Sequence, residues 1–552
     1  MSEFHGSFVL VLHCHVPYFL HHDPLGEEML FEAVAETYIP LLNVFHRLID
    51  EGISPKVTLT ISPVLAEQLA NPYFKSKFEE YCMMKADFAR RDQREFEGKN
   101  EHMRWLAQRW EEFYEGRLRD FNERYGRDLI RAFRELQDGG HIELMTCCAT
   151  HPYLPALSQD VSIQAQIKMA IKTHLHHFGR HPRGIWLPEC GYRPACRWSP
   201  PLTSYSGRPP YPRKGIEAFL SENDLEYFVI DQHQLERAWP PDLNKTPLDT
   251  YFVAGPQIPK KPVTVFVRDS RLSFQVWSHD WGYPGDGVYL DFHKRHADGR
   301  LRYWKVTHNK LDMAFKHLYY PDDAQNKLME HAGHYKWLIA QSLKANYHNT
   351  GQAKLVMTAF DAELFGHWWF EGPEWLYYVL KWISFDPEIK TATCSEYMDE
   401  NPAYNWVYLP ESSWGMNYDN STWMNKEVEW VLERIYHAEN EMIELAKAFA
   451  DNPDPHLARI LRQAMRELFI LQASDWEFMI TNWNTRNLAE KMVVERHEDF
   501  KRLAKMAWDY GSGRWVEESE WGFLTECELR EELFMEPEVW WFKELEYPPP
   551  EL

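Results

Sequence analysis

Short apolar runs that stop abruptly at polar residues recur along the first two thirds of the chain. Seven such runs lie at residues 7–12, 56–61, 142–146, 184–187, 226–231, 263–269 and 354–360. Runs of this length bounded by Pro, Gly or polar residues are typical of buried strands. A further apolar segment, 274–278, follows the sixth run. Helical patterns at 163–178, 214–222 and 322–345 alternate with the runs, so the repeated units predict a parallel α/β barrel.

Two other regions have a different pattern. From about residue 72 to 139, acidic and basic residues alternate at helical spacing, which predicts solvated helices inserted into the barrel, where they could form one wall of a groove. Helical patterns also dominate the C-terminal part, at 426–450, 456–472 and 487–510. We therefore expect a catalytic barrel over residues 1–400, with its insertion at about 72–139, and a helical C-terminal domain over 401–552.

Acidic residues follow two of the predicted strands. Glu189 comes directly after 184–188, and Asp361 ends the strand that begins at Lys354. The C-terminal ends of strands are where α/β barrels place catalytic groups. Glu189 could instead cap the next helix or pair with Arg193. However, two strand-end carboxylates among Trp, Tyr and His indicate glycosidic bond chemistry, with one acid as nucleophile and the other as proton donor and acceptor.

Histidines occupy other strand ends. His13 and His15 point to the same side of an extended chain, where they could bind sugar hydroxyls, bind a metal ion or serve the structure alone. His151 also follows a strand. Asp475 lies at the end of a helical pattern. It could cap a helix or form a buried ion pair, or it could lean onto the barrel and close the site. The long irregular segment 232–250 is a candidate lid.

Composition narrows the possible ligands. The 552 residues include 24 Trp and carry a net charge of −23. A strongly acidic chain is repelled by phosphate backbones and anionic lipid, so we expect neither nucleic acid nor a membrane as partner, whereas a neutral polymer is compatible. Tryptophan in excess suits a carbohydrate groove, because the C–H faces of a pyranose lie flat against aromatic rings.

The cysteine content and the first apolar run bear on the cellular compartment of the protein. The eight cysteines are sparse and lack zinc-knuckle spacing, which predicts reduced thiols in a cytoplasmic protein. The first apolar run is short and lacks a basic leader, so we interpret it as a strand, not a signal peptide. The sequence contains neither a dinucleotide fingerprint nor a P-loop, and we expect no cofactor and no metal.

Five segments, taken in order, resemble glycoside hydrolase family 57, and within it the branching enzymes that act on α-1,4-glucans. The segments are His13–Pro17, Gly140–His151, Trp186–Tyr192, Thr358–His367 and the region of Trp414 and Trp423 together with Ser474–Trp476. The resemblance covers nearly the whole chain. It implies an incomplete (β/α)7 barrel similar to a TIM barrel, with a helical insertion and an all-helical C-terminal domain.

The resemblance also implies roles for individual residues. Glu189 would be the nucleophile and Asp361 the general acid/base. Four residues would line the subsite of the attacked glucose: His13, His15, His151 and Asp475. Three would form an aromatic gate around the acceptor path: Trp277, Trp414 and Trp423. Arg268, with Asp269, would form the floor of the site.

The implied reaction is a retaining transfer that cleaves an α-1,4 bond and forms an α-1,6 branch on a glucan. The sequence departs from the family at the mobile loop, where the family carries a tyrosine and this chain offers Trp239. An α-amylase or 4-α-glucanotransferase of the same family is the first alternative. A metal-dependent deacetylase or mannosidase, with His13 and His15 as ligands, and a catalytically inactive glucan-binding protein are others. We expect a monomer or a small homo-oligomer.

Overall fold

Seven parallel strands form the centre of the molecule. The computed structural model describes residues 3–256, 259–278 and 280–550. Side by side, the strands are β10 (Lys354–Asp361), β1 (Gly6–Cys14), β2 (Val57–Ile61), β3 (Ile142–Cys147), β4 (Gly184–Trp186), β7 (Tyr227–Asp231) and β9 (Thr264–Arg268). The seven predicted runs are therefore confirmed as strands. The sheet curls without closing its hydrogen-bonded ring, since β10 and a short strand, β12, are the ends of the strand order.

Three short strands extend the sheet. β8 (Tyr251–Val253) pairs antiparallel with β9, and β12 (Trp406–Val407) pairs with β8. β11 (Ile389–Thr391) pairs with β1. Because β12 lies beyond residue 400 and still joins the sheet, the segment after 401 packs on the barrel before the C-terminal helices begin. The division at residue 400 stays a prediction.

The strands are apolar because both of their faces are buried. All nine residues of β1 are buried. Alternate side chains point to opposite faces: Phe8, Leu10 and Leu12 pack towards the surrounding helices, whereas Val9 and Val11 pack with residues of the barrel interior. Near-continuous apolar runs are what this two-sided burial requires.

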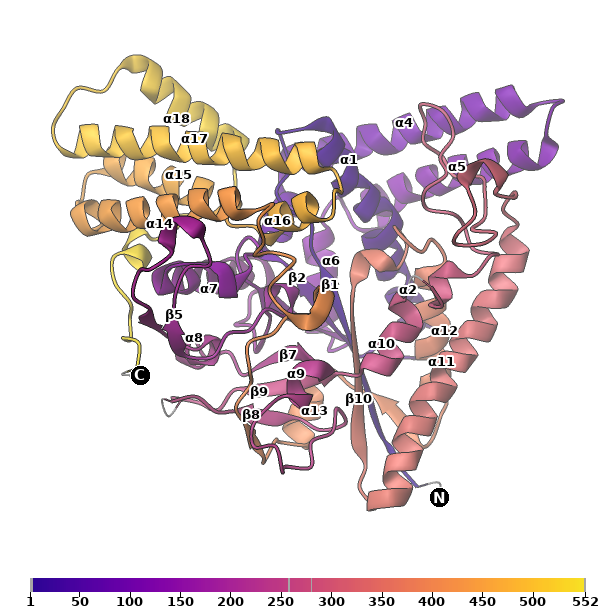
Figure 1. Cartoon of the computed structure of the whole chain (residues 1–552). Helices are drawn as coiled ribbons and strands as arrows, with labels where there is room; N and C mark the ends of the chain where they lie inside the picture. Colours follow the sequence, from indigo (N-terminus) through magenta and orange to yellow (C-terminus); the bar gives the residue numbers. More distant parts are fainter. Residues whose placement is uncertain (1–2, 257–258, 279, 551–552) are drawn as a thin grey trace.

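Helices surround the barrel (Figure 1). Those flanking the parallel strands are α1 (Pro24–Ala33), α2 (Ile39–Asp50), α3 (Pro63–Ala70), α6 (Leu129–Asp138), α7 (Asp160–Phe178), α8 (Ile216–Glu222), α9 (Gln232–Glu236), α10 (Ser270–Trp277), α11 (Pro321–Thr350), α12 (Gly372–Ser384) and α13 (Cys394–Glu400). The apolar segment at 274–278 is the end of α10. The long α11 starts with Pro321 at a first-turn position and ends at Gly351, whose φ of 68° suits glycine.

The first part of the predicted insertion, 72–139, is a hairpin of two long helices, α4 (Pro72–Phe96) and α5 (Glu101–Arg119), that projects from the barrel (Figure 1). Its last helix, α6, instead packs beside the sheet. Asparagines cap both N-termini. The Asn71 side chain accepts from Tyr73 N at 2.8 Å, and that of Asn100 accepts from Met103 N at 3.1 Å. These caps satisfy amide groups that have no partner within their own helix.

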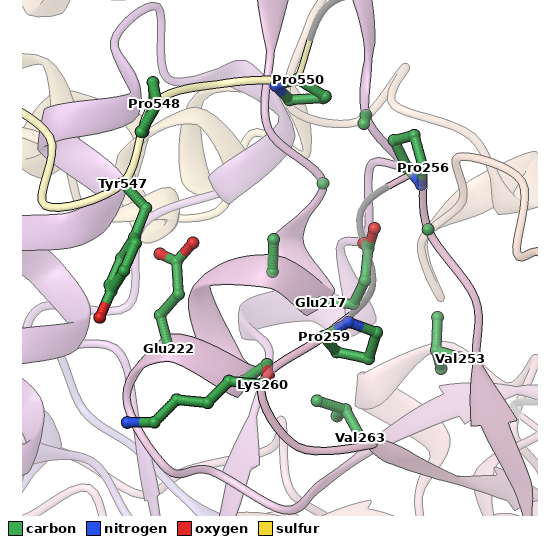
Figure 2. A pocket seen from close by; sticks show the side chains of 15 residues that line it. Glu217, Glu222, Val253, Pro256, Pro259, Lys260, Val263, Tyr547, Pro548 and Pro550 are labelled. Atoms are coloured by element: carbon green, nitrogen blue, oxygen red, sulfur yellow. The ribbon is translucent and has the colours of Figure 1, made fainter.

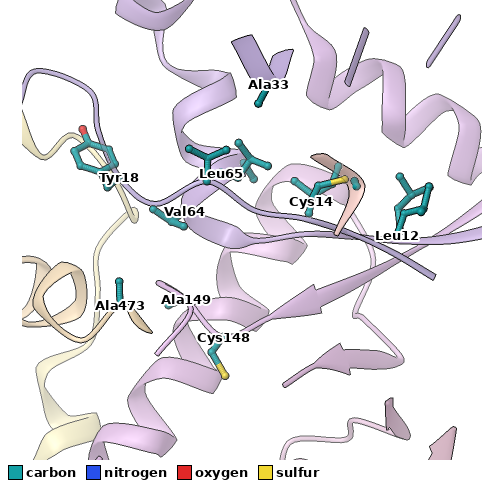
Figure 3. Close-up of a cluster of buried hydrophobic side chains, with 14 of the residues drawn as sticks. Leu12, Cys14, Tyr18, Ala33, Val64, Leu65, Cys148, Ala149 and Ala473 are labelled. Atoms are coloured by element: carbon teal, nitrogen blue, oxygen red, sulfur yellow. The ribbon is translucent and has the colours of Figure 1, made fainter. Parts of the chain in front are cut away.

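The C-terminal region is helical, as predicted, and its helices lie together above the barrel in Figure 1. They are α14 (Glu429–Phe449), α15 (Pro455–Leu471), α16 (Ser474–Thr481), α17 (Arg486–Gly511) and α18 (Glu518–Arg530). Figure 3 shows Ala473, just before α16, close to Cys148 and Ala149 of the barrel. Hydrogen bonds also join the regions, such as that from Tyr436 Oη to the Ala156 carbonyl oxygen, 2.7 Å. Among the described residues, none of the helices has the length and hydropathy needed to cross a bilayer.

Candidate active site

The strand ends bring the two predicted catalytic acids to the same edge of the barrel. Asp361 is the last residue of β10 and lies opposite His13 of β1 in the parallel register. Glu189 follows β4 in a short turn. Both residues are largely buried but keep some exposure to solvent.

The turn that carries Glu189 holds its backbone in a left-handed conformation, with φ 60° and ψ 21°. A non-glycine residue in this region costs about 1–3 kcal/mol, and such strain clusters at functional sites. Two contacts hold the side chain. Trp414 Nε1 donates to Glu189 Oε2 at 2.7 Å, and Ser474 Oγ donates to Oε1 at 3.3 Å. Both partners come from beyond residue 401, so the C-terminal part completes the site.

The environments of the two acids separate their protonation states. Burial raises the pKa of Glu189 to about 7, although the hydrogen bond from Trp414 opposes this shift. The pKa of Asp361 lies well above its usual range because of burial and the negative charges of Glu363 and Glu189. One acid can therefore be ionised while the other keeps its proton, which is the division that acid-assisted nucleophilic attack needs.

Three imidazoles and one carboxylate gather beside Glu189. His13 Nε2 and His151 Nε2 are 3.0 Å apart, and His15 Nε2 is 3.0 Å from Asp475 Oδ2. The rings of His15 and His151 stack with centroids 4.0 Å apart. The structure thus brings together all four residues predicted for one subsite, and Asp475 does lean onto the barrel.

Burial determines the charge of two of these histidines. It lowers the pKa of His13 and of His151 well below the usual range. At neutral pH both rings are therefore uncharged, and each offers one donor and one acceptor nitrogen. Ser474 Oγ lies 2.9 Å from His151 Nδ1, and Ser62 Oγ lies 2.8 Å from His15 Nδ1. These contacts fix the ring orientations, which suits the binding of sugar hydroxyls.

The same side chains also have the types that metal ions use. Ligand atoms of His15, His151 and Asp475 lie within 4.8 Å of one another, as do those of His13, Cys147 and His151. Histidine, cysteine and carboxylate side chains are the types of ligand that bind divalent transition metals. His13 Nε2 contacts His151 Nε2, and His15 Nε2 contacts Asp475, whereas His13 Nδ1 is buried without a hydrogen-bond partner.

The tryptophans predicted around the site differ in how close they lie to it. Trp414 is central: its ring lies 5.0 Å from that of Trp186 and 6.4 Å from that of Trp277. Trp277 also packs edge-on against Trp368, with centroids 6.1 Å apart. Trp423 is only 1% exposed and stacks on Tyr153 at 4.5 Å. Trp414 and Trp277 therefore border the site, whereas Trp423 supports the wall from behind.

The two residues predicted for the floor have different positions. Arg268 Nη1 pairs with Asp231 at 3.0 Å, and its guanidinium lies 5.4 Å from the centre of the Trp414 ring. Arg268 is also one of the charges that act on Asp361. The Asp269 carboxylate instead caps α10, accepting from Leu272 N at 2.9 Å. Its contact is structural, because capping satisfies the first turn of that helix.

Comparisons with known proteins agree with this arrangement. The family model described as glycosyl hydrolase family 57 matches residues 9–410, which is most of the chain. The chain belongs to glycosyl hydrolase family 57. A second family model, described as the C-terminal part of 1,4-alpha-glucan branching enzyme, matches residues 434–542. The resemblance seen in the sequence is thus confirmed.

Several named proteins are similar to this chain. A 1,4-alpha-glucan branching enzyme of Thermococcus kodakarensis is 38% identical over 511 residues, which is 90% of this chain and 73% of that protein. The crystal structure of a family 57 branching enzyme from Pyrococcus horikoshii aligns with a TM-score of 0.90 at 37% identity, covering 100% of this chain and 98% of that one. The α-amylase AmyC of Thermotoga maritima aligns with a TM-score of 0.83 at 28% identity, covering 98% and 99%.

Sequence reasoning missed three groups that this family 57 site contains. Glu363 is buried; it accepts from His15 N at 3.1 Å and from the Tyr38 hydroxyl. Ser474 joins Glu189 to His151. Glu363 stands two residues after Asp361 in the same motif, and Ser474 precedes Asp475, so both were next to predicted residues. Tyr38 gives no such signal, because only packing brings it to β10.

A separate cavity of about 420 Å³ is lined by none of the predicted site residues. Figure 2 shows Glu222 of α8 beside Tyr547 of the C-terminal tail, and Glu217 of the same helix on the other side of the cavity, near Pro259. Tyr192 Oη donates to Glu217 Oε2 at 2.6 Å. This buried contact anchors the chain three residues after Glu189, so Glu217 supports the turn that carries the acid.

Proposed function

We propose that this family 57 protein is a 1,4-alpha-glucan branching enzyme. Support comes from the branching-enzyme C-terminal model and from relatives of that name over nearly the whole chain. The observation that carries the proposal is the pair of strand-end acids, Glu189 and Asp361, whose protonation states differ. Trp414 and Ser474 cover Glu189 and donate hydrogen bonds to it. Bond chemistry belongs to residues 1–400, and 401–552 supply the covering wall.

The reaction proceeds by two displacements. Asp361 donates its proton to the glycosidic oxygen while the ionised Glu189 attacks the anomeric carbon. The α-1,4 bond breaks, the shortened glucan leaves as an alcohol, and a covalent glycosyl-enzyme forms. Asp361 then removes the proton from a glucan 6-hydroxyl, which displaces Glu189 and creates an α-1,6 branch. Retention by this route requires the two carboxylates to be about 5–5.5 Å apart.

The surrounding residues bind and orient the glucan. Four side chains hold the hydroxyls of the attacked glucose: His13, His15, His151 and Asp475. Trp277 and Trp414 guide the acceptor, with Trp423 supporting the wall from behind. The guanidinium of Arg268 completes the floor and, by its positive charge, limits the rise of the Asp361 pKa. These neutral and aromatic surfaces suit an uncharged polymer.

Branching requires water to be kept from the glycosyl-enzyme until the acceptor arrives. The wall made by Trp414 and Ser474 contributes to this exclusion. Segment 232–250 is the proposed lid. It carries Trp239 where the family has a tyrosine, and its backbone pairs with that of Tyr408.

Variants of the two acids test the assignment. Glu189→Gln and Asp361→Asn should each reduce turnover of amylose by at least about a thousandfold, whereas Asp399→Asn, an exposed acid on α13, should not. Proton NMR of the wild-type products should show new α-1,6 linkages. Near wild-type turnover in either variant would refute the assignment, and new reducing ends without branches would favour the α-amylase alternative, which the likeness to AmyC supports.

We also propose the setting in which the enzyme acts. The eight cysteines are unpaired, which is compatible with the reducing cytoplasm. The net charge of −23 argues against nucleic acid as a partner. The enzyme is then a monomer or a small homo-oligomer that binds α-glucan alone. Activity that survives a chelator would separate this proposal from the metal-dependent alternative.

A further inference from the structure

Exposed aromatic side chains follow one edge of the sheet. Tyr404, Trp406 and Tyr408 are 67%, 42% and 47% exposed, whereas Val407 and Leu409 between and beyond them are at most 3% exposed. Alternate residues of an extended chain point to the same face and lie about 6.5–7 Å apart. The three rings therefore form a row, which we name the aromatic stripe.

Two neighbouring rings widen the aromatic stripe. Phe252 of β8 lies 5.0 Å from the Trp406 ring, and Trp239, 61% exposed, lies 5.4 Å from the Tyr408 ring. The backbone is held on both sides: Phe252 N donates to the Asn405 carbonyl at 2.8 Å, and Trp239 N donates to the Tyr408 carbonyl at 3.0 Å. A surface fixed in this way loses little conformational freedom when it binds a ligand.

A short segment of chain connects the aromatic stripe to the active site. Trp414, which donates to Glu189, comes six residues after Tyr408, and six extended residues span at most about 20 Å. Trp239 belongs to the segment that follows β7, whose last residue, Asp231, pairs with Arg268. A polymer that leaves the catalytic pocket on this side would meet the row of rings.

The chemistry of the surface selects its ligand. Contiguous exposed apolar patches are characteristic of surfaces that bind a partner or a ligand. The net charge of −23 disfavours anionic polymers. Ring faces with phenol tips fit a pyranose, which presents apolar C–H faces and hydroxyls together. We propose that the aromatic stripe is a non-catalytic platform that binds the part of an α-1,4-glucan chain lying outside the catalytic pocket; this inference rests on the proposed function.

The double variant Tyr404→Ala/Trp406→Ala tests the platform, because both side chains are exposed and their loss leaves the core intact. The matched control is Trp337→Ala/Trp515→Ala, at side chains that are 53% and 83% exposed elsewhere on the surface. Retardation in native gels containing amylopectin measures binding without activity. Branching kinetics on long amylose and on a short maltooligosaccharide measure the role of chain length.

The stripe variant should bind amylopectin about tenfold more weakly and show a KM for long amylose about tenfold higher, with kcat and short-substrate kinetics unchanged. The control should match the wild type. Equal behaviour of the two double variants overturns the proposal. So does a wild-type dimer, seen by light scattering, that the stripe variant converts to a monomer with unchanged glucan binding. A wild type that is retarded but forms no branches would instead refute the proposed function and leave the platform standing.

Discussion

Replacing Trp414 by phenylalanine should move the acid limb of the pH–rate profile. The indole Nε1 donates to Glu189 Oε2 at 2.7 Å and stabilises the ionised carboxylate. Phenylalanine keeps an aromatic ring but removes that donor. A hydrogen bond to a charged group contributes about 1.5–3 kcal/mol, and one pKa unit corresponds to about 1.4 kcal/mol. The pKa of Glu189, now about 7, should therefore rise by about one to two units.

The direction of the change follows from the proposed role of Glu189 as nucleophile. The nucleophile must be ionised, so kcat/KM falls as the pH decreases through its pKa. A higher pKa moves this fall to higher pH, and the variant should lose most of its activity at pH 7 while recovering part of it in more alkaline solution. The assay is kcat/KM for branching of amylose as a function of pH.

Trp277→Phe is the matched control, because it alters the indole stacked on Trp414 and keeps the Trp414–Glu189 hydrogen bond. Its acid limb should stay within about half a pH unit of the wild type, since the donor to Glu189 remains. If the profile of Trp414→Phe coincides with that of the wild type, the hydrogen bond does not set the ionisation of Glu189. If both variants shift equally, the cause is the aromatic wall and not the donor.

Two further predictions concern stability. Gly366→Ala should lower the free energy of unfolding by more than about 3 kcal/mol, because the added Cβ would lie 1.7 Å from a backbone oxygen. Gly351→Ala, also at positive φ but in open space, should lower it by about 1 kcal/mol. Equal losses in urea unfolding would contradict this steric reasoning. Glu439→Gln should flatten the pH dependence of stability. Burial raises the pKa of the Glu439 carboxyl in the folded protein to about 7, from 4.5 in the unfolded chain. As the pH rises between these values, the unfolded chain loses this proton before the folded protein does, so the folded protein becomes less stable. By pH 8 this effect costs the wild type up to about 3 kcal/mol of stability, and the glutamine variant should not show it. If the stability of the variant and that of the wild type change equally between pH 5 and pH 8, the prediction is wrong.

Local sequence was sufficient for the strands and for the acids that end them. The seven apolar runs are the seven parallel strands, because burial on both faces requires continuous apolar residues. Glu189 and Asp361 follow such runs directly, and parallel strands bring their C-terminal ends to one edge. Asp269 had the same strand-end position, yet its carboxylate caps α10. Position along a strand therefore indicates where a side chain lies, but not which group it contacts.

By itself, the sequence determined the positions of the seven strands, the helical regions and the acids at the strand ends, since each depends on residues close together along the chain. Only the tertiary structure decided that Asp475 meets His15, that Trp414 holds Glu189 and that Trp423 stands behind the wall. Those contacts join segments hundreds of residues apart, and they depend on how the C-terminal helices pack on the barrel. The separated pKa values of the two acids have the same origin, because burial and neighbouring charges exist only once the chain has folded.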